Sequence, residues 1–350
     1  MTGANYLVVG ASGVTGGAIA GHLSATGRAV TALSRSGSRS GDAAAGQTVL
    51  LGDLSREDGV PRGSLSDVTG VVYAAYVEDT THAATTRRNA AMVRNLLNAL
   101  DRDGAEVEQI QLIGGGKSYG EHLGPYRTPA KEADPRLLGP ILYNPQEDAI
   151  RDWAHRNGAS WTVLRPDGVI GWGARSPMNI LSGVAAFAML SRSEGVPLRF
   201  PGSWGAWRAL HQATDARILA RAVEWAFTAP TAKNDIFNVT NGDHFRWCHL
   251  WPAIAEFFDM PAAEPQPLDL EAHMFDRDAE WAELTTRQGL RATSFRDFVA
   301  WPFVEAWWRT DFDMVQSTIK IRQAGFADCI DSHQSFVEHL SALRDDRFIS

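Results

Sequence analysis

The chain has 350 residues, of which 44% are hydrophobic and 21% are charged. This composition is ordinary for a globular protein and excludes a disordered chain, a collagen repeat and a coiled coil. The 33 lysines and arginines against 41 aspartates and glutamates give a net charge of −8. An acidic chain without a dense basic run is not expected to bind nucleic acid or an anionic membrane. At roughly 150 residues per domain, the length suggests two structural units or one large body with a cap.

The cysteines and the apolar runs indicate in which cellular compartment the protein resides. Cys248 and Cys329 have no CxxC spacing and cannot build a disulfide framework, which suits a reducing cytosol. The longest apolar run, Val184 to Leu190, is far too short to span a bilayer. No basic segment precedes the first strand-like run, so no signal peptide is expected. We therefore expect a soluble, cytoplasmic protein.

Short apolar runs alternate with helical stretches along the chain. Strands are expected at Asn5–Val9, Ala29–Leu33, Gln47–Leu51, Val68–Tyr76, Glu108–Ile113, Trp161–Arg165 and Asp235–Val239. Helices are expected around 18–23, 87–100 and 147–155. Strands and helices that alternate at this spacing imply an α/β fold with a Rossmann-like, doubly wound parallel sheet.

The distribution of aromatic residues suggests how the two units are arranged. All twelve tryptophans lie between Trp153 and Trp308, in the bulkier later part of the chain. We expect a dinucleotide-binding domain at residues 1–171 and about 208–248. An interleaved, mostly helical substrate-binding cap is expected at about 172–207 and 249–350. Tyr76, Trp207 and Phe303 are candidates for an apolar substrate pocket, although core packing explains most of the aromatic residues equally well.

A glycine turn follows the first expected strand. Gly10, Gly13 and Gly16 form a GxxGxxG pattern between this strand and a helix. Glycine permits the tight turn and lets backbone N–H groups and the helix N-terminus approach a pyrophosphate. The complete strand–turn–helix context favours a dinucleotide site over a mere tight turn.

The end of the second expected strand indicates which dinucleotide binds. An acidic residue there would accept a hydrogen bond from the adenosine ribose and favour NAD. This chain has Arg35 instead, which can pair with a 2′-phosphate and therefore favours NADP(H). A solvated surface arginine is the alternative. Asp53, after the third expected strand, could meet an adenine amino group, although a local helix cap explains it nearly as well.

The usual catalytic pair of short-chain reductases is missing. Those enzymes carry a tyrosine and a lysine four residues apart on one helix, and none of the six tyrosines here has lysine at that spacing. Tyr143 has Glu147 there instead. Either the proton-handling pair is built differently, or the protein is not catalytic.

Several segments resemble one family over nearly the whole chain. They are Lys117-Ser118-Tyr119, the run from Leu142 to Asp148 (LYNPQED), Leu164-Arg165-Pro166 through Gly171, Ser176 to Asn179 (SPMN), Phe237 to Asp243, Phe245-Arg246-Trp247 and Gly325-Phe326. Together they are similar to progesterone 5-beta-reductase and iridoid synthase-like proteins, which are atypical extended short-chain dehydrogenases. The family uses NADPH to reduce the carbon–carbon double bond of enones and enals.

The resemblance implies catalytic roles for Lys117, after the fifth strand, and Tyr143, at the start of the following helix. An ammonium and a phenol aimed at the substrate oxygen would stabilise an enolate as an oxyanion hole does. The cofactor-binding candidates are Gly10, Ser12, Gly13, Val14, Gly16, Ser34, Arg35, Asp53, Leu54, Tyr73, Pro166, Val169, Ile170, Ser176 and Met178.

Two positions depart from the family pattern. Asn144 replaces the second tyrosine of the signature, and Pro145 follows it. Asparagine, proline and Glu147 at this spacing predict an N-cap, a first helical residue and a capping box, which would leave Tyr143 just outside the helix. Ser118 stands where the family usually has histidine, so a different substrate shape is expected.

We therefore expect an NADPH-dependent reductase that performs 1,4-reduction of a small apolar carbonyl compound. A ketoreductase or alcohol dehydrogenase and a non-catalytic NADP-sensing regulator remain the alternatives, and a sugar-nucleotide epimerase is a weaker one. No metal site is expected, since His244, Cys248 and His249 are a poor ligand set. Whether the protein forms a homodimer stays open.

Overall fold

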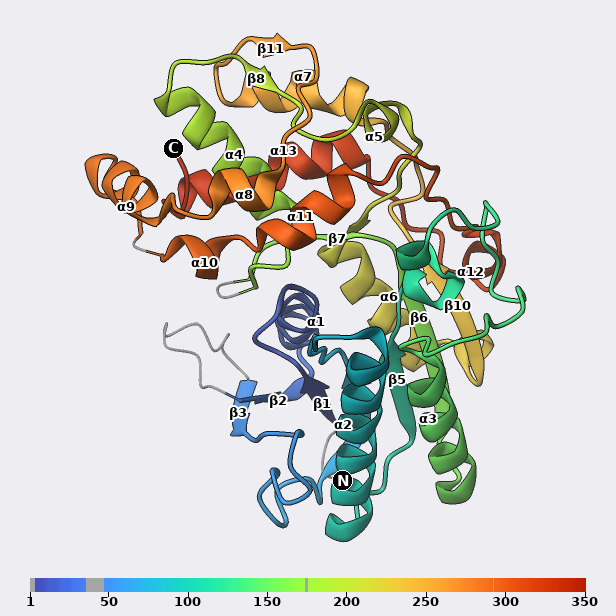
Figure 1. Cartoon of the computed structure of the whole chain (residues 1–350). Coiled ribbons are helices and arrows are strands. Elements are labelled where there is room, and N and C mark those ends of the chain that lie inside the picture. The colour runs from blue at the N-terminus through green and yellow to red at the C-terminus, as the bar shows by residue number, and fades with distance from the viewer. Residues whose placement is uncertain (1–3, 36–46, 174–175, 292) are drawn as a thin grey trace. The chain divides into compact units, whose positions relative to one another are not determined.

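The computed structural model describes residues 4–35, 47–173, 176–291 and 293–350. It divides into two compact units that the chain enters more than once (Figure 1). The first unit comprises residues 1–167, 216–240 and 316–328, and the second comprises 168–215, 241–315 and 329–350.

The first unit is built on a seven-stranded parallel sheet with the order β10-β6-β5-β4-β1-β2-β3. Its strands are β1 (Asn5–Val9), β2 (Ala29–Ser34), β3 (Gln47–Leu51), β4 (Val68–Tyr73), β5 (Gln109–Ile113), β6 (Ser160–Pro166) and β10 (Asp235–Val239). The chain order reverses between β1 and β4. Ligands of such sheets bind at this reversal, outside the carboxyl ends of the strands.

Two pairs of helices flank the sheet. Helix α1 (Val14–Ala25) packs beside α6 (Ala216–Thr228), and α2 (His82–Asp103) packs beside α3 (Asn144–Asn157) (Figure 1). Right-handed crossovers that run outward from β1 and from β4 place the two pairs on opposite faces. The apolar side chains of β1, β4 and β5 and the buried stripe of α2 form the core between them. This architecture confirms the predicted Rossmann-like fold.

The second unit is mostly helical, as predicted for the cap. Its helices are α4 (Ile180–Ser193), α5 (Trp204–Arg208), α7 (Trp247–Phe257), α8 (Leu270–Met274), α9 (Asp278–Arg287), α10 (Phe295–Phe298), α11 (Trp301–Trp308) and α13 (Ser332–Asp345). Two short parallel pairs join β7 (Val169–Ile170) to β9 (Thr214–Asp215) and β8 (Leu198–Arg199) to β11 (Ala262–Ala263).

Aromatic rings fill the core of the second unit. This unit contains nine of the twelve tryptophans of the chain. Trp247, Trp251 and Trp308 are fully buried, with ring centroids 5.6–6.1 Å apart and near-perpendicular ring planes. This edge-to-face geometry is the arrangement that the ring quadrupoles favour. Core packing therefore explains these three rings.

The boundaries between the units differ from those predicted. Residues 168–171, 208–215 and 241–248, expected in the first unit, belong to the second, where β7 pairs with β9. Residues 316–328, expected in the cap, belong to the first unit because α12 (Ile319–Gln323) packs on β10 and Phe326 contacts Trp225. Packing across long sequence separations set these boundaries, and no compositional change marks them.

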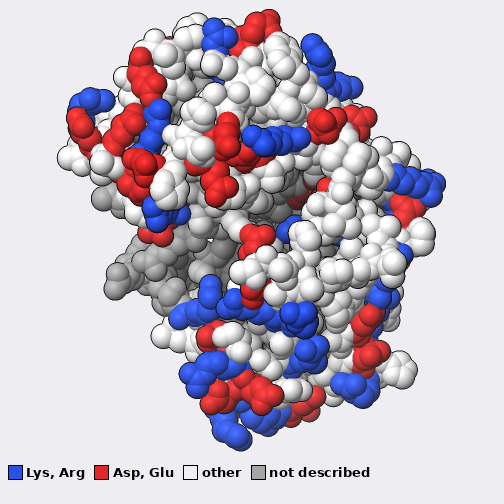
Figure 2. All heavy atoms as spheres, viewed as in Figure 1, with Lys and Arg blue, Asp and Glu red and all other residues white. Residues whose placement is uncertain are grey.

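Charged side chains are mixed over the surface. On the face shown in Figure 2, basic and acidic side chains are interspersed. In the part of the chain that the structure describes, no helix is both long and apolar enough to cross a membrane.

Candidate functional site

The glycine turn after β1 needs glycine for steric reasons at two positions. Gly10 has φ +84°, and a Cβ there would lie 2.9 Å from the backbone nitrogen of Ala75. A Cβ on Gly16 would lie 2.3 Å from the carbonyl oxygen of Gly10. The N–H of Gly13 donates to that same carbonyl at 3.0 Å, which closes the turn. The backbones of β1, α1 and the segment after β4 thus approach one another closely, as the predicted site requires.

The N-terminus of α1 is suited to an anion. Gly13 is its N-cap residue and provides no capping side chain, and the first turn contains no acidic residue. Ser12 beside it is exposed, whereas Val14 is buried in the unit. The first N–H groups of a helix lack partners within the helix and carry its positive dipole end. A phosphate is the group that such an end binds best.

Two candidate residues for the adenosine end follow β2 and β3. Arg35 comes directly after β2, which ends at Ser34, and its side chain is exposed. The Asp53 carboxylate accepts a hydrogen bond from the Ser55 N–H at 3.0 Å. Hydrogen bonds from Ser55, followed by the charge of Arg35, lower the pKa of Asp53. Asp53 thus closes a local turn, and no helix begins directly after it among the described residues, so the helix-capping alternative is wrong.

The remaining cofactor candidates divide between the two units. The side chains of Leu54 and Tyr73 lie in the core of the first unit, so those positions could meet a ligand only through the main chain. Pro166 ends β6 in the same unit. The other four, Val169, Ile170, Ser176 and Met178, belong to the second unit.

Lys117 lies in a short 3₁₀ turn, Gly116–Tyr119, that follows β5 and a run of glycines. Its Nζ donates a hydrogen bond to the Tyr76 hydroxyl at 3.2 Å and lies 5.0 Å from the centroid of that ring. Among the described residues, the ammonium forms this hydrogen bond and no ion pair. Because an ammonium has three donors, Lys117 retains hydrogen-bonding capacity for a ligand. Tyr76, predicted only as a pocket residue, therefore contacts the predicted catalytic lysine.

Tyr143 occupies the N-cap position of α3, just outside the helix, as its sequence context predicted. Its hydroxyl packs against Gly115, where a Cβ would lie 3.1 Å from the phenol oxygen. Burial first, and then the nearby Tyr76 and Glu121, raise the pKa of Tyr143. The phenol therefore stays protonated, and it can donate a hydrogen bond but cannot serve as a phenolate base.

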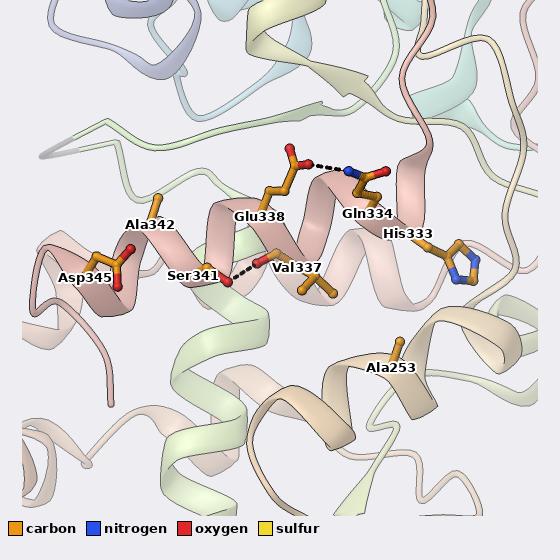
Figure 3. A pocket seen from close by; sticks show the side chains of 8 residues that line it. All are labelled: Ala253, His333, Gln334, Val337, Glu338, Ser341, Ala342 and Asp345. Carbon is orange, nitrogen blue, oxygen red and sulfur yellow. Dashed lines mark hydrogen bonds between the residues drawn. The ribbon is translucent and has the colours of Figure 1, made fainter.

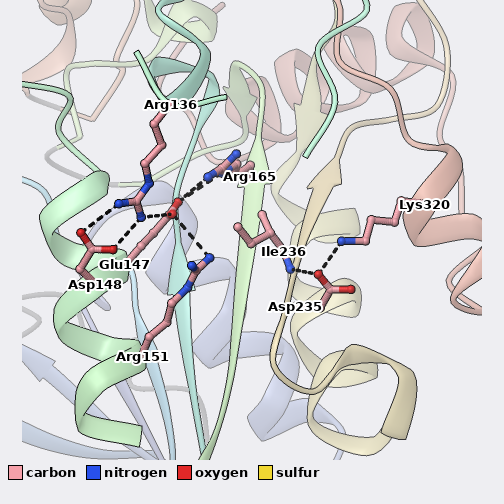
Figure 4. A network of polar contacts seen from close by, with 8 residues as sticks. All are labelled: Arg136, Glu147, Asp148, Arg151, Arg165, Asp235, Ile236 and Lys320. Atoms are coloured by element: carbon pink, nitrogen blue, oxygen red, sulfur yellow. Dashed lines mark hydrogen bonds and ion pairs between the residues drawn. The ribbon is translucent and has the colours of Figure 1, made fainter. Parts of the chain in front are cut away.

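The capping box predicted at Glu147 is wrong. Asn144 and Pro145 are the first two helical residues, and no side chain caps the helix. The Glu147 carboxylate is instead fully buried and accepts hydrogen bonds from Arg165 at 2.7 Å and Arg136 at 3.3 Å (Figure 4). A buried carboxylate requires paired charges and hydrogen bonds, and here the partners come from β6 and from the loop before α3. This network fixes the first turn of α3, and with it the residue before the turn, Tyr143.

Two further acids, which the sequence did not single out, lie near Lys117. Glu121 begins the next 3₁₀ turn, Glu121–Leu123, and Asp167 directly follows β6. Both follow strands whose carboxyl ends lie at one edge of the sheet, so the topology brings them together. Their charges interact with each other, and Glu121 also interacts with Lys117. No short sequence motif connects residues that are this far apart in the chain.

Trp207 and Phe303 belong to the second unit, where both are partly buried against its aromatic core. That unit also carries a surface groove of about 510 Å³ between α7 and α13, lined by Ala253, His333, Gln334, Val337, Glu338, Ser341, Ala342 and Asp345 (Figure 3). None of these is a predicted site residue. Gln334 donates to Glu338 at 2.6 Å and Ser341 to the Val337 carbonyl at 2.9 Å, so several of the polar groups already have partners within α13. In the described residues, no group of three or more potential ligands is placed to hold a metal ion.

Comparisons with solved structures show the same architecture. The fold matches a putative epimerase from Burkholderia cenocepacia with a TM-score of 0.70 and 18% identity, over 98% of this chain and 99% of that one. A short-chain dehydrogenase/reductase superfamily protein from Agrobacterium tumefaciens, solved with bound NAD, matches with a TM-score of 0.66 and 16% identity, over 98% of each chain. At these identities the likeness concerns the fold alone.

Sequence comparisons identify the family. The model of the PRISE-like Rossmann-fold domain matches residues 54–338. The chain is 31% identical to the (S)-8-oxocitronellyl enol synthase of Antirrhinum majus over 296 residues, which cover 81% of this chain and 75% of that protein. It is 28% identical to the short chain dehydrogenase gsfE of Penicillium aethiopicum, over 79% of this chain and 78% of that one. These matches confirm the resemblance found in the sequence: the chain belongs to the PRISE-like family, and it is an oxidoreductase of the short-chain dehydrogenase/reductase type.

Proposed function

We propose that this protein is an NADPH-dependent reductase of activated carbon–carbon double bonds in small apolar enones or enals. The observation that carries the proposal is the cluster of Lys117, Tyr76 and Tyr143 at the carboxyl edge of the sheet. Lys117 offers a positive charge, and Tyr143 offers a protonated phenol. The Antirrhinum relative is named for making an enol. An enol or enolate is what results when hydride adds to the β-carbon of an unsaturated aldehyde.

The first unit fits the cofactor. The glycine turn leaves no room for side chains at Gly10 and Gly16, and the uncapped start of α1 offers N–H groups to a pyrophosphate. Arg35, exposed after β2, would pair with the 2′-phosphate. When it is bound, NADPH supplies the hydride.

The residues of the site would act on the substrate oxygen. Negative charge moves onto the carbonyl oxygen as the β-carbon is reduced. Tyr143 donates a hydrogen bond to this oxygen, and Lys117 provides a positive charge beside it. Removal of one such donor from an oxyanion hole typically costs about 10²–10³ in kcat.

The placement of the lysine supports reduction at the β-carbon. In the usual pair, the helix carries both residues and the proton donor lies beside the carbon that receives hydride. Here the lysine comes from the turn after β5, and Glu147, at the usual lysine position, is held in its own ion pairs. We infer that the pair holds the carbonyl oxygen away from the nicotinamide. Because a misplacement of about 1 Å can cost roughly 100-fold in rate, only one of the two carbons would react.

A labelling experiment tests the proposal. The protein is supplied with NADPH deuterated at C4 and a panel of enones, enals and saturated ketones, and the products are analysed by mass spectrometry and NMR. We expect a saturated carbonyl product with deuterium on the β-carbon. Deuterium on a carbinol carbon would show a ketoreductase instead, and NADPH binding without turnover of any compound would indicate a sensor.

A further inference from the structure

Glu121 is an acid that the mechanism above does not use, and its side-chain oxygen Oε2 is buried although the residue as a whole is partly exposed. Its side chain folds back over Gly116, so that a Cβ on Gly116 would lie 1.8 Å from Oε2 and 2.4 Å from Cδ. Lys117 is the next residue along the chain. The carboxyl group therefore lies against the backbone that carries the lysine, and a larger residue at position 116 would displace it.

One of the two carboxyl oxygens of Glu121 lacks the hydrogen-bond partner that an ionised acid needs. Oε2 is buried and has no hydrogen-bond partner among the described residues. Arg136 and Arg165, which neutralise the nearby Glu147, make their ion pairs with that residue and not with Glu121. Burying an unpaired carboxylate is far more costly than burying the neutral acid.

The charges that face Glu121 come from several elements. Asp167 follows β6, Lys117 lies in the preceding turn, and Tyr143 lies at the start of α3. Burial first, and then the negative charge of Asp167, raise the pKa of Glu121 well above its usual range, and Lys117 opposes them. Two neighbouring carboxyl groups in a sheltered site lose their protons one at a time.

Two titratable groups that interact with Lys117, His122 and Tyr76, are neutral near pH 7. Burial, with the charges of Lys117 and His82, lowers the pKa of His122 to about 4. Burial raises the pKa of Tyr76, against the effect of Lys117. A neutral Glu121 would leave the Lys117 ammonium as the group that faces a developing anion, with Asp167 as the other acid of the cluster.

We propose that Glu121 is a positioning residue that must remain a neutral acid for the site to work, and that its ionisation at alkaline pH switches the reaction off. This role rests on the function proposed above. A second carboxylate beside Lys117 would offset the ammonium and repel the negative charge that forms on the substrate oxygen. Since the ionisation of Glu121 adds that charge, kcat/KM should fall as the pH rises through it.

The pH dependence of kcat/KM tests this role. For the unmodified protein we expect a fall of about tenfold per pH unit above the ionisation, as for loss of one essential proton. Glu121→Gln has the same shape and cannot ionise, so this alkaline fall should disappear. Asp167→Asn removes the like charge, so the fall should begin at lower pH. His122→Asn, the matched control from the neighbouring residue, should leave the fall in place. An alkaline fall that is the same in all four proteins would overturn the proposal and assign it to Lys117 or Tyr143.

A measurement on the resting protein separates this proposal from the proposed function. The infrared difference spectrum between the unmodified protein and Glu121→Gln, recorded without cofactor or substrate, should show a protonated carboxyl band at neutral pH that vanishes at alkaline pH. The band can be present even if no enone is reduced. In that case the proposed function is wrong, and the assignment of a proton to Glu121 is still supported. If only carboxylate bands are seen at neutral pH, the proposal is wrong whatever the protein reduces.

Discussion

At the scale of single residues, Tyr143 has one chemical role open to it. Its phenol is sheltered at the start of α3 and remains protonated, so it can donate a hydrogen bond but cannot accept a proton. Tyr143→Phe removes only that donor. We expect kcat to fall by about 10²–10³ while NADPH affinity stays within a factor of about two, because the bond matters once charge has developed on the substrate.

Steady-state kinetics and cofactor titration check this expectation. Tyr6→Phe is the matched control, since among the described residues the Tyr6 hydroxyl, in β1, receives only a long 3.5 Å contact from Arg28. Its kcat should not change. If Tyr143→Phe retained full activity, the donor would have to be another residue, with Tyr76 the first candidate.

Arg35 is expected to determine the choice between the two nicotinamide cofactors. A charge-assisted hydrogen bond to phosphate contributes about 1.5–3 kcal/mol, so NADPH should bind at least about tenfold more tightly than NADH. Arg35→Asp should abolish or reverse this preference. Titration calorimetry with both cofactors measures it, and Arg156→Asp, an exposed charge reversal at the end of α3, is the control. Equal affinities in the unmodified protein would contradict the assignment.

The site could be predicted only in part from single residues. The glycine turn and Arg35 are local patterns with direct physical meanings, so the sequence alone predicted them. Lys117 and Tyr143 were found through a family resemblance, because no local spacing links a loop lysine to a tyrosine on the next helix. The contact between Lys117 and Tyr76 spans 41 residues, and the approach of Glu121 to Asp167 likewise depends on the order of the strands.

At the scale of the elements, α1 offers two glycines with opposite expected behaviour. Gly16→Ala forces a Cβ to within 2.3 Å of the Gly10 carbonyl, so the turn must shift. We expect it to cost about 1–3 kcal/mol of stability and to weaken NADPH binding by at least about tenfold. Gly21, further along the same helix, has nothing within 4 Å of its ideal Cβ.

Gly21→Ala is therefore the matched control, and it should stabilise the protein by about 0.5–1 kcal/mol because alanine is the better helix former. Urea unfolding and cofactor titration of both variants measure these changes. Similar effects of the two substitutions would show that helix propensity, and not the close approach to Gly10, determines the outcome.

The strands were predicted more accurately than the helix ends. β1, β3 and β10 have the predicted bounds, because each strand appears in the sequence as a short apolar run between turn residues, even the edge strand β3, in which no residue is buried. The start of α3 was wrong in detail. Asn144, Pro145 and Glu147 match the local pattern of a capped helix, but two arginines from outside the helix, in the preceding loop and in β6, pair with Glu147 and override that pattern.

At the scale of the whole molecule, the interleaving of the units should make unfolding cooperative. If the second unit unfolded alone, its segments 168–215 and 241–315 would become loops of 48 and 75 residues that the first unit must still close. The entropic cost of closing a loop grows with the logarithm of its length and is about 3–4 kcal/mol for each of these two. We therefore expect one transition rather than two.

Two probes distinguish these cases. Tryptophan emission reports mainly on the second unit, which holds nine of the twelve tryptophans, whereas far-ultraviolet circular dichroism reports on both. Their urea midpoints should coincide and should rise together when NADP⁺ is added. At 100 times its dissociation constant, the cofactor should raise the free energy of unfolding by about 2.7 kcal/mol. Separate midpoints, with only one that responds to NADP⁺, would contradict this prediction.

The interleaving also has a consequence for the order in which the protein can fold during synthesis. When residues 1–167 have left the ribosome, β6 forms an open edge of the sheet, because its neighbour β10 is not made until residues 235–239. Exposed edge strands are templates for aggregation. The core of the second unit waits still longer, because Phe336, Leu340 and Leu343 of α13 are part of it. The nascent chain therefore carries an open strand edge until β10 is made and an unfinished aromatic core until α13 is made, and both kinds of surface make folding intermediates prone to aggregate.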